Sequence, residues 1–508
     1  MGGVRTALYN YLYAKQAGGD FILRIEDTDS QRFVPGAEAY IIEALRWCGI
    51  YPDEGVDEAG NVVEVASEKH PHAPYRQSQR RGIYRKYAEE LVAKGYAYYA
   101  FDTAEELAAL RTAAEAEKKT FTYNWETRGS LCNSLTLPAD EVARRLAEET
   151  GWTIRFKIPE NRTVAMDDLI RGHIEVNSNT LDDKVLWKRA DELPTYHLAN
   201  IVDDHLMEIT EVIRGEEWLP SLPLHYLLYE AFGWQDSQPR FAHLSLLLKP
   251  DGKGKLSKRD GDRLGFPVFP LRWVNAEGEV SRGYREDGYF PEAFVNMLAF
   301  LGWNPGDDTE LYTLDELIPV FSLEELVKVF TLERVIKSGA RFNPDKAKWF
   351  NQEYLRMRPT EKLVAEFRAA EGERVAAFSD EYIGGVLDLM RERVHFPTEF
   401  HDATAFFFEA PAEYDPAAVA KFWKDDIPAL LPQVRSVIAE LDPFTKEHVG
   451  ESVEGLIREN GWPMGKVMNT LRLFLVGKSM GPGVAEMMAL MGKDEVLRRI
   501  DRGIATLS

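Results

Sequence analysis

The chain has 508 residues, of which 45% are hydrophobic and 28% charged, and its formal net charge is −22. This length exceeds one ordinary core, so we expect three or four domains, and the composition excludes a disordered or fibrous protein. Without a run of about 18 apolar residues or a recognisable leader, the sequence predicts a cytoplasmic protein that no membrane anchors. Because acidic residues outnumber basic ones by 83 to 61, any nucleic-acid partner must bind a local basic surface.

The first predicted helix covers residues 1–16, where Val4, Leu8 and Leu12 recur at helical spacing. It opens with Gly2 and Gly3. Backbone N–H groups at such a helix start suit an anion such as phosphate. A frayed terminus also explains the glycine pair, and the pair alone favours that interpretation.

Strands and helices then alternate. Residues 21–25 are an apolar run typical of a buried parallel strand, and the run ends in acidic residues that begin with Glu26. Helices are predicted from Pro35 and over residues 84–94. This alternation predicts a parallel sheet, whose carboxyl edge is where α/β proteins bind ligands.

From residue 96 to about residue 191, short alternating runs and a charged helical stretch predict an inserted α+β module. Buried runs return at 194–205 and 208–215, so we expect the first sheet to resume there. Arg214 would then lie at the end of a strand and face a ligand pocket. A salt bridge to Glu216 or Glu217 accounts for Arg214 equally well.

Residues 246–261 form a glycine-rich, cationic stretch that contains the pentapeptide KLSKR (255–259). Between residues 246 and 263, six Lys or Arg and three Asp give a net charge of +3. Glycines let a backbone close over a polyphosphate, and lysine ammonium groups supply charges for phosphoryl oxygens. A solvated basic turn is the competing interpretation.

After a predicted hairpin at 272–284, the chain reads as helical to its end. Residues 331–358 carry seven basic residues against three acids, and residues 462–482 carry three basic residues and no acid. Aromatic residues, among them Trp349, Phe350 and Trp462, accompany these charges, as in single-stranded nucleic-acid sites. Ordinary helix packing with solvated lysines is the alternative.

Six segments together resemble the class I aminoacyl-tRNA synthetases, and within them the bacterial-type glutamyl-tRNA synthetases. They are GGVRTALYNYLYAK (2–15), LRIEDTD (23–29), PTYHLANIVDDH (194–205), VIRGEEW (212–218), KLSKR (255–259) and FPEAFVNMLAFLGW (290–303). The resemblance implies a multidomain fold, α/β and then all-α: a Rossmann-like parallel-sheet catalytic domain with an inserted α+β module, followed by a helical anticodon-binding region.

The domains expected from this resemblance are the two catalytic halves at 1–95 and 192–240, an inserted acceptor-stem-binding module at 96–191, a KLSKR loop and stem-contact domain at 241–330, and helical anticodon-binding subdomains at 331–400 and 401–508. The implied activity is that of a glutamate–tRNA ligase, with glutamate, ATP with Mg²⁺ and tRNA(Glu) as partners and a monomer as the expected state. A non-catalytic tRNA-binding protein that keeps the scaffold is the alternative. Whether tRNA(Gln) is also charged stays open.

The resemblance also assigns site residues. The expected roles are catalysis by Lys255 and Lys258; ATP binding by Gly2, Gly3, Lys255, Ser257 and Lys258; glutamate binding by Glu26, Tyr196, Asn200 and Arg214; and tRNA binding by Lys466 and Arg472.

The chain departs from the family pattern in two places. Many relatives hold zinc through a Cys-x-Cys pair, whereas Ala100 and Asp102 occupy those positions here, so we predict no zinc. The family also opens with a strand and a His-x-Gly-Gly element, whereas this sequence starts at Met1 inside that element.

A start codon placed too late explains the second departure better than a truncated, inactive chain does, because a sheet without a central strand would expose an unpaired edge. We therefore expect coding sequence in frame upstream of Met1. Stop codons there in every strain would contradict this expectation.

Overall fold

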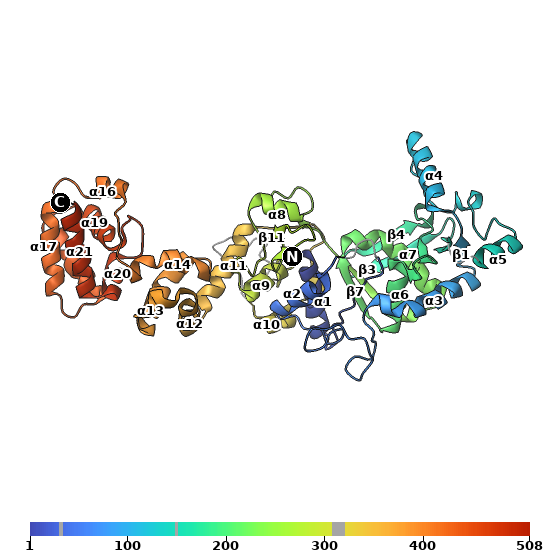
Figure 1. Ribbon diagram of the computed structural model, residues 1–508, viewed down its shortest axis with the longest axis horizontal. Helices are drawn as coiled ribbons and strands as arrows, with labels where there is room; N and C mark the ends of the chain where they lie inside the picture. The colour runs from blue at the N-terminus through green and yellow to red at the C-terminus, as the bar shows by residue number, and fades with distance from the viewer. Residues whose placement is uncertain (30–33, 148–150, 307–320, 508) are drawn as a thin grey trace. The chain divides into compact units, whose positions relative to one another are not determined.

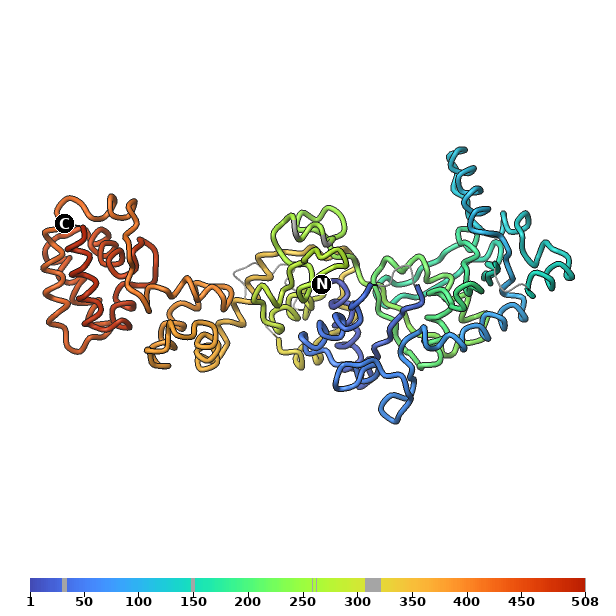
Figure 2. The backbone as a smooth tube through the Cα atoms, viewed as in Figure 1, coloured from blue at the N-terminus to red at the C-terminus, as the bar shows by residue number. Residues whose placement is uncertain are grey.

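The computed structural model describes residues 1–29, 34–147, 151–306 and 321–507. The chain divides into two compact units (Figure 1). The first comprises Met1–Asp287 with Phe294–Pro344, and the second comprises Gly288–Ala293 with Asp345–Ser508. The first unit mixes helices and strands, and the second is helical over its described residues, as the chain trace in Figure 2 also shows.

The first unit contains a four-stranded sheet with the order β4-β3-β8-β7. Its strands are β3 (Thr163–Asp168), β4 (Gly172–Asn177), β7 (Glu211–Gly215) and β8 (Arg240–Leu244). Strands β3, β8 and β7 run parallel, and β4 is antiparallel to β3. Helix α7 (Leu222–Phe232) joins β7 to β8 and is buried along most of its length. The predicted Rossmann-like parallel sheet is therefore present.

The expectation that the first sheet resumes at residues 194–205 is wrong. A short strand β6 (Leu193–Pro194) is followed by helix α6 (Tyr196–Leu206), in which Leu198, Ile201 and Val202 are fully buried. Their spacing of three and four residues is the period of a helix face, and this period was mistaken for a strand run. Only the second run, which contains β7, joins the sheet.

Residues 21–25, predicted as a strand, are extended but join none of the named strands. They pair in parallel with other loop segments through two isolated bridges, Ile22 with Glu54 and Ile25 with Arg76. Helices α1 (Gly2–Gln16), α2 (Ala37–Trp47) and α3 (Arg81–Ala93) form where helices were predicted.

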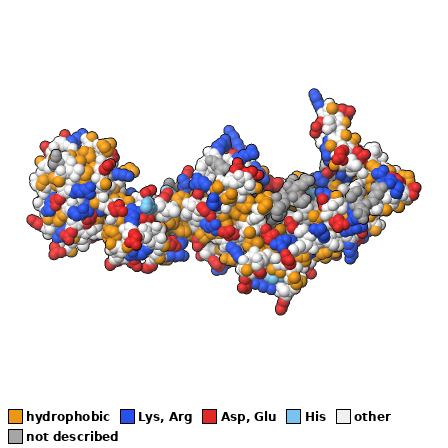
Figure 3. Space-filling view, in the orientation of Figure 1, with side chains coloured by type: hydrophobic (Ala, Val, Ile, Leu, Met, Phe, Trp, Pro, Cys, Tyr) orange, Lys and Arg blue, Asp and Glu red, His pale blue; other side chains and the backbone are white. Residues whose placement is uncertain are grey.

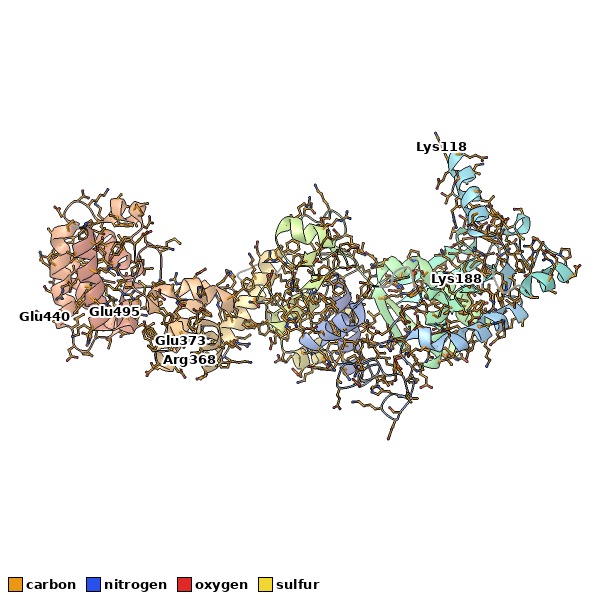
Figure 4. All side chains as sticks on the ribbon, in the orientation of Figure 1. Lys118, Lys188, Arg368, Glu373, Glu440 and Glu495 are labelled. Carbon is orange, nitrogen blue, oxygen red and sulfur yellow. The ribbon has the colours of Figure 1, made fainter. Side chains whose placement is uncertain are left out.

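A second sheet has the order β1-β2-β5-β6 and is antiparallel throughout. It contains β1 (Ala97–Ala100), β2 (Thr153–Phe156) and β5 (Val185–Lys188). Helix α4 (Ala104–Ala116) projects beside it, and Figure 4 labels Lys118 at its free tip. Helix α5 (Ala139–Ala147) follows. The β3-β4 hairpin lies between β2 and β5 in sequence but belongs to the parallel sheet.

The KLSKR pentapeptide lies at the junction of a hairpin and a helix. Strand β9 (Leu247–Leu248) pairs in parallel with β12 (Ala340–Arg341), and Leu248 bridges Lys255 on the returning arm. Helix α8 (Lys258–Leu264) begins after Ser257. The predicted hairpin at 272–284 is confirmed by β10 (Trp273–Val274) and β11 (Val280–Ser281), and helices α9 (Pro291–Ala299) and α10 (Leu323–Val329) follow.

The second unit packs its helices around apolar side chains, among them Met487 and Met488, which are fully buried. Its helices are α11 (Pro344–Met357), α12 (Thr360–Glu371), α13 (Asp380–Met390), α14 (Phe400–Ala403), α15 (Ala405–Phe408), α16 (Pro416–Phe422), α17 (Ile427–Glu440), α18 (Lys446–Glu459), α19 (Met464–Val476), α20 (Val484–Met491) and α21 (Lys493–Leu507). Across the described residues of both units, none of the helices has the length and apolar character needed to cross a membrane.

Gly55 fixes the path of the extended segment 21–25. Its φ is +111°, and a Cβ atom added there would lie 2.1 Å from the carbonyl oxygen of Leu23. We expect Gly55→Ala to lower the free energy of unfolding by about 2 kcal/mol or more, because the backbone must shift. Urea unfolding of the variant measures this. Gly129→Ala, at a site with open space around the added carbon, serves as the control and should change stability little. Equal effects at both sites would contradict this explanation.

Candidate functional site

A cavity of about 880 Å³ lies in the first unit, between α1, α6, β7 and the segment 21–26. Five residues predicted from the sequence line it: Gly3, Glu26, Tyr196, Asn200 and Arg214. Gly2, Lys255 and Ser257 are described but lie outside this lining. The side chain of Lys258 lies outside the described residues; its backbone begins α8.

Arg214 is 8% exposed and hydrogen-bonds to neutral groups. Its Nε donates to Nε2 of His243 over 3.0 Å, and one Nη donates to the Tyr196 hydroxyl over 3.0 Å. The same Nη lies 3.4 Å from Nδ1 of His225, and the other donates to the carbonyl of Trp218 over 3.5 Å. Among the described residues, no acidic side chain pairs with this guanidinium.

The two glutamates that could have neutralised Arg214 are engaged elsewhere. Glu216 pairs with Arg171 and accepts a hydrogen bond from the backbone N–H of Leu246 over 2.9 Å. Glu217 lies 3.2 Å from the ammonium group of Lys255. The alternative interpretation of Arg214 as a partner of either glutamate is therefore wrong.

Tyr196 presents its hydroxyl between Arg214 and the cavity. Its ring stacks on Trp218 with centroids 4.2 Å apart, and burial raises its pKa to about 12, against the effect of Arg214. The phenol therefore stays protonated at neutral pH. Its oxygen accepts from Arg214, so its own O–H can be donated to a ligand.

Arg24 is a cavity residue that the sequence analysis missed, because it lies inside an apolar run interpreted as strand. Its guanidinium donates to Asp204 over 2.9 Å, to Glu26 over 3.1 Å and to Asn200 over 3.1 Å. Burial opposes the charge of Arg24, but Asp204 and Glu26 outweigh it and raise its pKa. Arg24 thereby fixes the positions of two predicted site residues. The signal was available: a charge inside a buried run requires partners.

Glu26 and Asp204 are the two cavity acids that contact Arg24. Removal from water raises the pKa of each carboxyl group, and Arg24 acts in the opposite direction on both. Side-chain exposure is 37% for Glu26 and 7% for Asp204. Of these two acids, Glu26 is therefore the more accessible to a ligand.

The start of α1 lies against the KLSKR hairpin. A Cβ atom on Gly2 would be 4.0 Å from Leu247, and the amino group of Met1 donates to the carbonyl of Val268 over 2.8 Å. The first N–H groups of a helix have no partner within the helix. The structure thus brings together the start of α1 and the lysine-rich hairpin, which lie far apart in sequence.

The hairpin displays its cations outward, and Figure 3 shows Lys and Arg side chains gathered over this part of the first unit. Gly252 and Gly254 adopt φ of +74° and +87°, which permits the tight return of the chain. Ser257 and Asp260 form a capping box at the start of α8, and Lys249 lies 3.3 Å from Asp260. The Ser257 side chain therefore has a structural role in addition to its predicted one.

The two residues predicted to bind tRNA lie on α19 in the second unit. Lys466 lies 2.7 Å from Asp425, and Arg472 donates to Asn469 over 2.8 Å and to the carbonyl of Pro482 over 3.2 Å. Burial and the neighbouring cation Arg393 lower the pKa of Arg472. Arg393 is thus a basic neighbour that the sequence analysis missed, because it comes from a distant segment.

Of the aromatic residues that accompany the basic segments, Phe350 is fully buried and its ring contacts Trp349 at 5.1 Å. Phe350 belongs to the helix core and is unavailable for stacking on a base.

No group of three His, Cys, Asp or Glu side chains suited to a metal ion occurs in the described part of the chain. At the two positions that the sequence analysis compared with a Cys-x-Cys pair, Ala100 ends β1, and Asp102 accepts hydrogen bonds from the Tyr123 hydroxyl and the Cys132 N–H, both over 2.9 Å.

Comparison with known proteins places this geometry in a family. Residues 1–349 match the model of "tRNA synthetases class I (E and Q), catalytic domain", and residues 358–504 match an anticodon-binding domain. A glutamate–tRNA ligase of Porphyromonas gingivalis is 53% identical over the whole chain and 96% of its own length. One from Bacteroides thetaiotaomicron is 52% identical over 507 residues.

A solved structure agrees with these matches. The crystal structure of a glutamate tRNA ligase from Elizabethkingia meningosepticum, in complex with its amino acid, is 50% identical and superposes with a TM-score of 0.89 over 100% of this chain and 97% of its own. The chain is therefore a class I aminoacyl-tRNA synthetase. Within that class it belongs to the family of the E and Q enzymes.

We expect the stability of the protein to depend on pH through His197, a partly buried histidine near Arg214. Burial lowers the pKa of His197 to about 4 from an ordinary value of 6.5. Between these values the unfolded chain binds a proton that the folded chain does not, so stability present above pH 6.5 is lost as the pH falls toward 4. We expect the free energy of unfolding, measured with urea, to fall as the pH is lowered from about 7 to about 5. The fall should be up to about 2 kcal/mol larger for wild type than for His197→Gln.

His173 provides a control of opposite sign. It is exposed on β4, and its pKa is raised by Asp167 and Glu175, so His173→Gln should lose more stability than wild type as the pH falls. Equal pH slopes for wild type and His197→Gln would contradict the account of His197.

Proposed function

We propose that this chain activates glutamate with ATP and transfers the glutamyl group to the 3′ end of tRNA(Glu). The observation that carries the proposal is the cation of Arg214, which is buried beside a cavity and contacts neutral groups. A buried charge normally has an opposite charge as its partner. A carboxylate of the ligand supplies that charge, and the relatives are glutamate–tRNA ligases.

The other polar side chains of the cavity suit the remaining charged groups of a glutamate ligand. The proposal assigns the Tyr196 hydroxyl and the amide of Asn200 to the substrate carboxylates and Glu26 to its ammonium group. Charge-assisted hydrogen bonds of this kind are stronger than neutral ones. Arg24 holds Glu26 and Asn200 in place, so this half of the site is organised before the ligand binds.

The proposal assigns ATP to the junction of the α1 start and the KLSKR hairpin. In the first step, a glutamate carboxylate oxygen attacks the α-phosphorus of ATP and pyrophosphate leaves. Gly2 and Gly3 offer backbone N–H groups, and Ser257 borders the site. Lys255 and Lys258 would neutralise the charge that develops on the phosphates. Mg²⁺ enters with ATP as part of the substrate.

In the second step, a hydroxyl of the terminal ribose attacks the acyl carbon of the adenylate and AMP leaves. We assign the module at 96–191 and the segment 241–330 to the tRNA stem, and the helical subdomains at 331–400 and 401–508 to the anticodon. Catalytic halves at 1–95 and 192–240 complete this organisation. We further propose that the chain is a monomer, that it is located in the cytoplasm and that residues 100–102 do not bind zinc.

Replacing Arg214 tests the carboxylate assignment. We expect Arg214→Ala to lower kcat/KM for glutamate by about 100-fold or more in tRNA(Glu) charging, because the ligand loses the partner of its buried charge. The KM for ATP should stay within about twofold. Arg240→Ala is the matched control, since Arg240 lies on the adjacent strand, is exposed and pairs with Glu211.

Wild type that binds tRNA(Glu) without charging it would contradict the proposed function and identify a non-catalytic tRNA-binding protein. A normal glutamate KM in Arg214→Ala would contradict only the role of Arg214.

The helical unit generates a separate prediction about tRNA affinity. We expect Lys466→Ala and Arg472→Ala each to weaken tRNA(Glu) binding several-fold in a filter-binding assay and to leave ATP affinity unchanged, because each removes a cation available to phosphates. Arg435→Ala, which breaks an exposed ion pair with Asp501 in the same unit, is the control. Unchanged affinity in both test variants would remove this surface from the proposal.

A further inference from the structure

We propose that Asp168 and His243 form a buried dyad that orients the guanidinium of Arg214 toward the cavity and preserves its charge for the ligand. Both are positioning residues, since they act through Arg214. The inference rests on the proposed function in that Arg214 is taken to bind a substrate carboxylate.

The sheet register creates the dyad. Arg214 on β7 lies directly opposite His243 on β8, and β3, which ends at Asp168, runs along the other side of β8. His243 is 0% exposed and Asp168 is 4% exposed. The His243 Nδ1 lies 2.6 Å from a carboxylate oxygen of Asp168, and its Nε2 lies 3.0 Å from Nε of Arg214. Three adjacent strands thus supply one continuous chain of hydrogen bonds.

Hydrogen-bond chemistry fixes the protonation of this chain. Hydrogen bonds from His243 and from the backbone N–H groups of Arg171 and Ile170 lower the pKa of Asp168, although burial acts to raise it. An ionised carboxylate only accepts, so Nδ1 of His243 must carry a proton. Arg214 only donates, so Nε2 must be unprotonated. His243 is therefore a neutral imidazole with a single tautomer.

The neutral ring separates two charges that would otherwise pair. Where acids contact an arginine directly, as Asp204 and Glu26 contact Arg24, they satisfy its charge. At Arg214 the imidazole accepts one hydrogen bond and keeps the Asp168 carboxylate one ring away from the guanidinium. The Nε side is thereby fixed, and the Nη groups remain directed toward Tyr196 and the cavity.

Another histidine reinforces the arrangement. The His225 Nδ1 lies 3.4 Å from an Nη of Arg214, and its Nε2 lies 3.3 Å from Nδ1 of His197. Burial lowers the pKa of His225 and also that of His243. The groups around the cation are thus neutral acceptors, which orient it without neutralising it.

Three variants of the full chain test the dyad in tRNA(Glu) charging. His243→Leu removes both hydrogen bonds, and we expect KM for glutamate to rise tenfold or more, with KM for ATP within about twofold. His243→Gln can donate to Asp168 and accept from Arg214, so its KM for glutamate should stay within about threefold of wild type. His173→Leu is the matched control, because it breaks an exposed His–Asp pair with Asp167, the residue next to Asp168.

A double-mutant cycle separates positioning from a purely structural role. In an Arg214→Lys background, which lacks the Nε donor, His243→Leu should change KM for glutamate by less than about twofold. A full tenfold change in that background, or equal increases in the KM values for glutamate and ATP, would overturn the inference. If His243→Leu does not fold, His243→Gln decides: a near-normal KM for glutamate supports the dyad and a tenfold increase overturns it.

Failure of the dyad and failure of the proposed function give different results. Wild type that does not charge tRNA(Glu) contradicts the proposed function. Wild type that charges normally, with a folded His243→Leu of unchanged glutamate KM, contradicts the dyad alone.

Discussion

The charge of one buried guanidinium organises this site. Removing an arginine from water costs free energy that an opposite charge normally offsets, and Arg214 contacts His243, Tyr196 and a backbone carbonyl instead. In the proposed function, a carboxylate of the ligand supplies the missing opposite charge. Under the proposed function, a ligand with a neutral side chain of the same shape should bind poorly, because it would leave the cation without a partner.

The segment after β7 connects Arg214 to the KLSKR hairpin, where the proposed function places the phosphates of ATP. Arg214 lies near the end of β7, and the next residues, Glu216 and Glu217, contact Leu246 and Lys255 at the base and on the returning arm of the KLSKR hairpin. Within residues 214–218, Arg214 and Trp218 therefore line the cavity, and Glu216 and Glu217 contact the cationic hairpin. Under the proposed function, one short segment thus carries contacts to the glutamate end and to the ATP end of the reaction.

The part of this arrangement that could be predicted from the sequence alone is the part with local signals. The roles of the glycine pair and of KLSKR follow from the family resemblance and stay predictions. The strand before Arg214 read correctly from its own apolar run. Segment 194–205 did not, since a fully buried helix and a buried strand give similar apolar runs. Asp168 and His243 were missed because their roles depend on partners from distant segments, whereas Arg24 was missed because it lies inside an apolar run that was interpreted as a strand. Strand register and side-chain pairing decide such roles, and a single sequence does not display them.

The most direct test of the account is a crystal structure of the chain with glutamate bound in the cavity. The account predicts a carboxylate of glutamate within hydrogen-bond distance of the Nη atoms of Arg214 and the hydroxyl of Tyr196, with Nε of Arg214 still bonded to His243. Glutamate bound with both carboxylates away from Arg214 would contradict it.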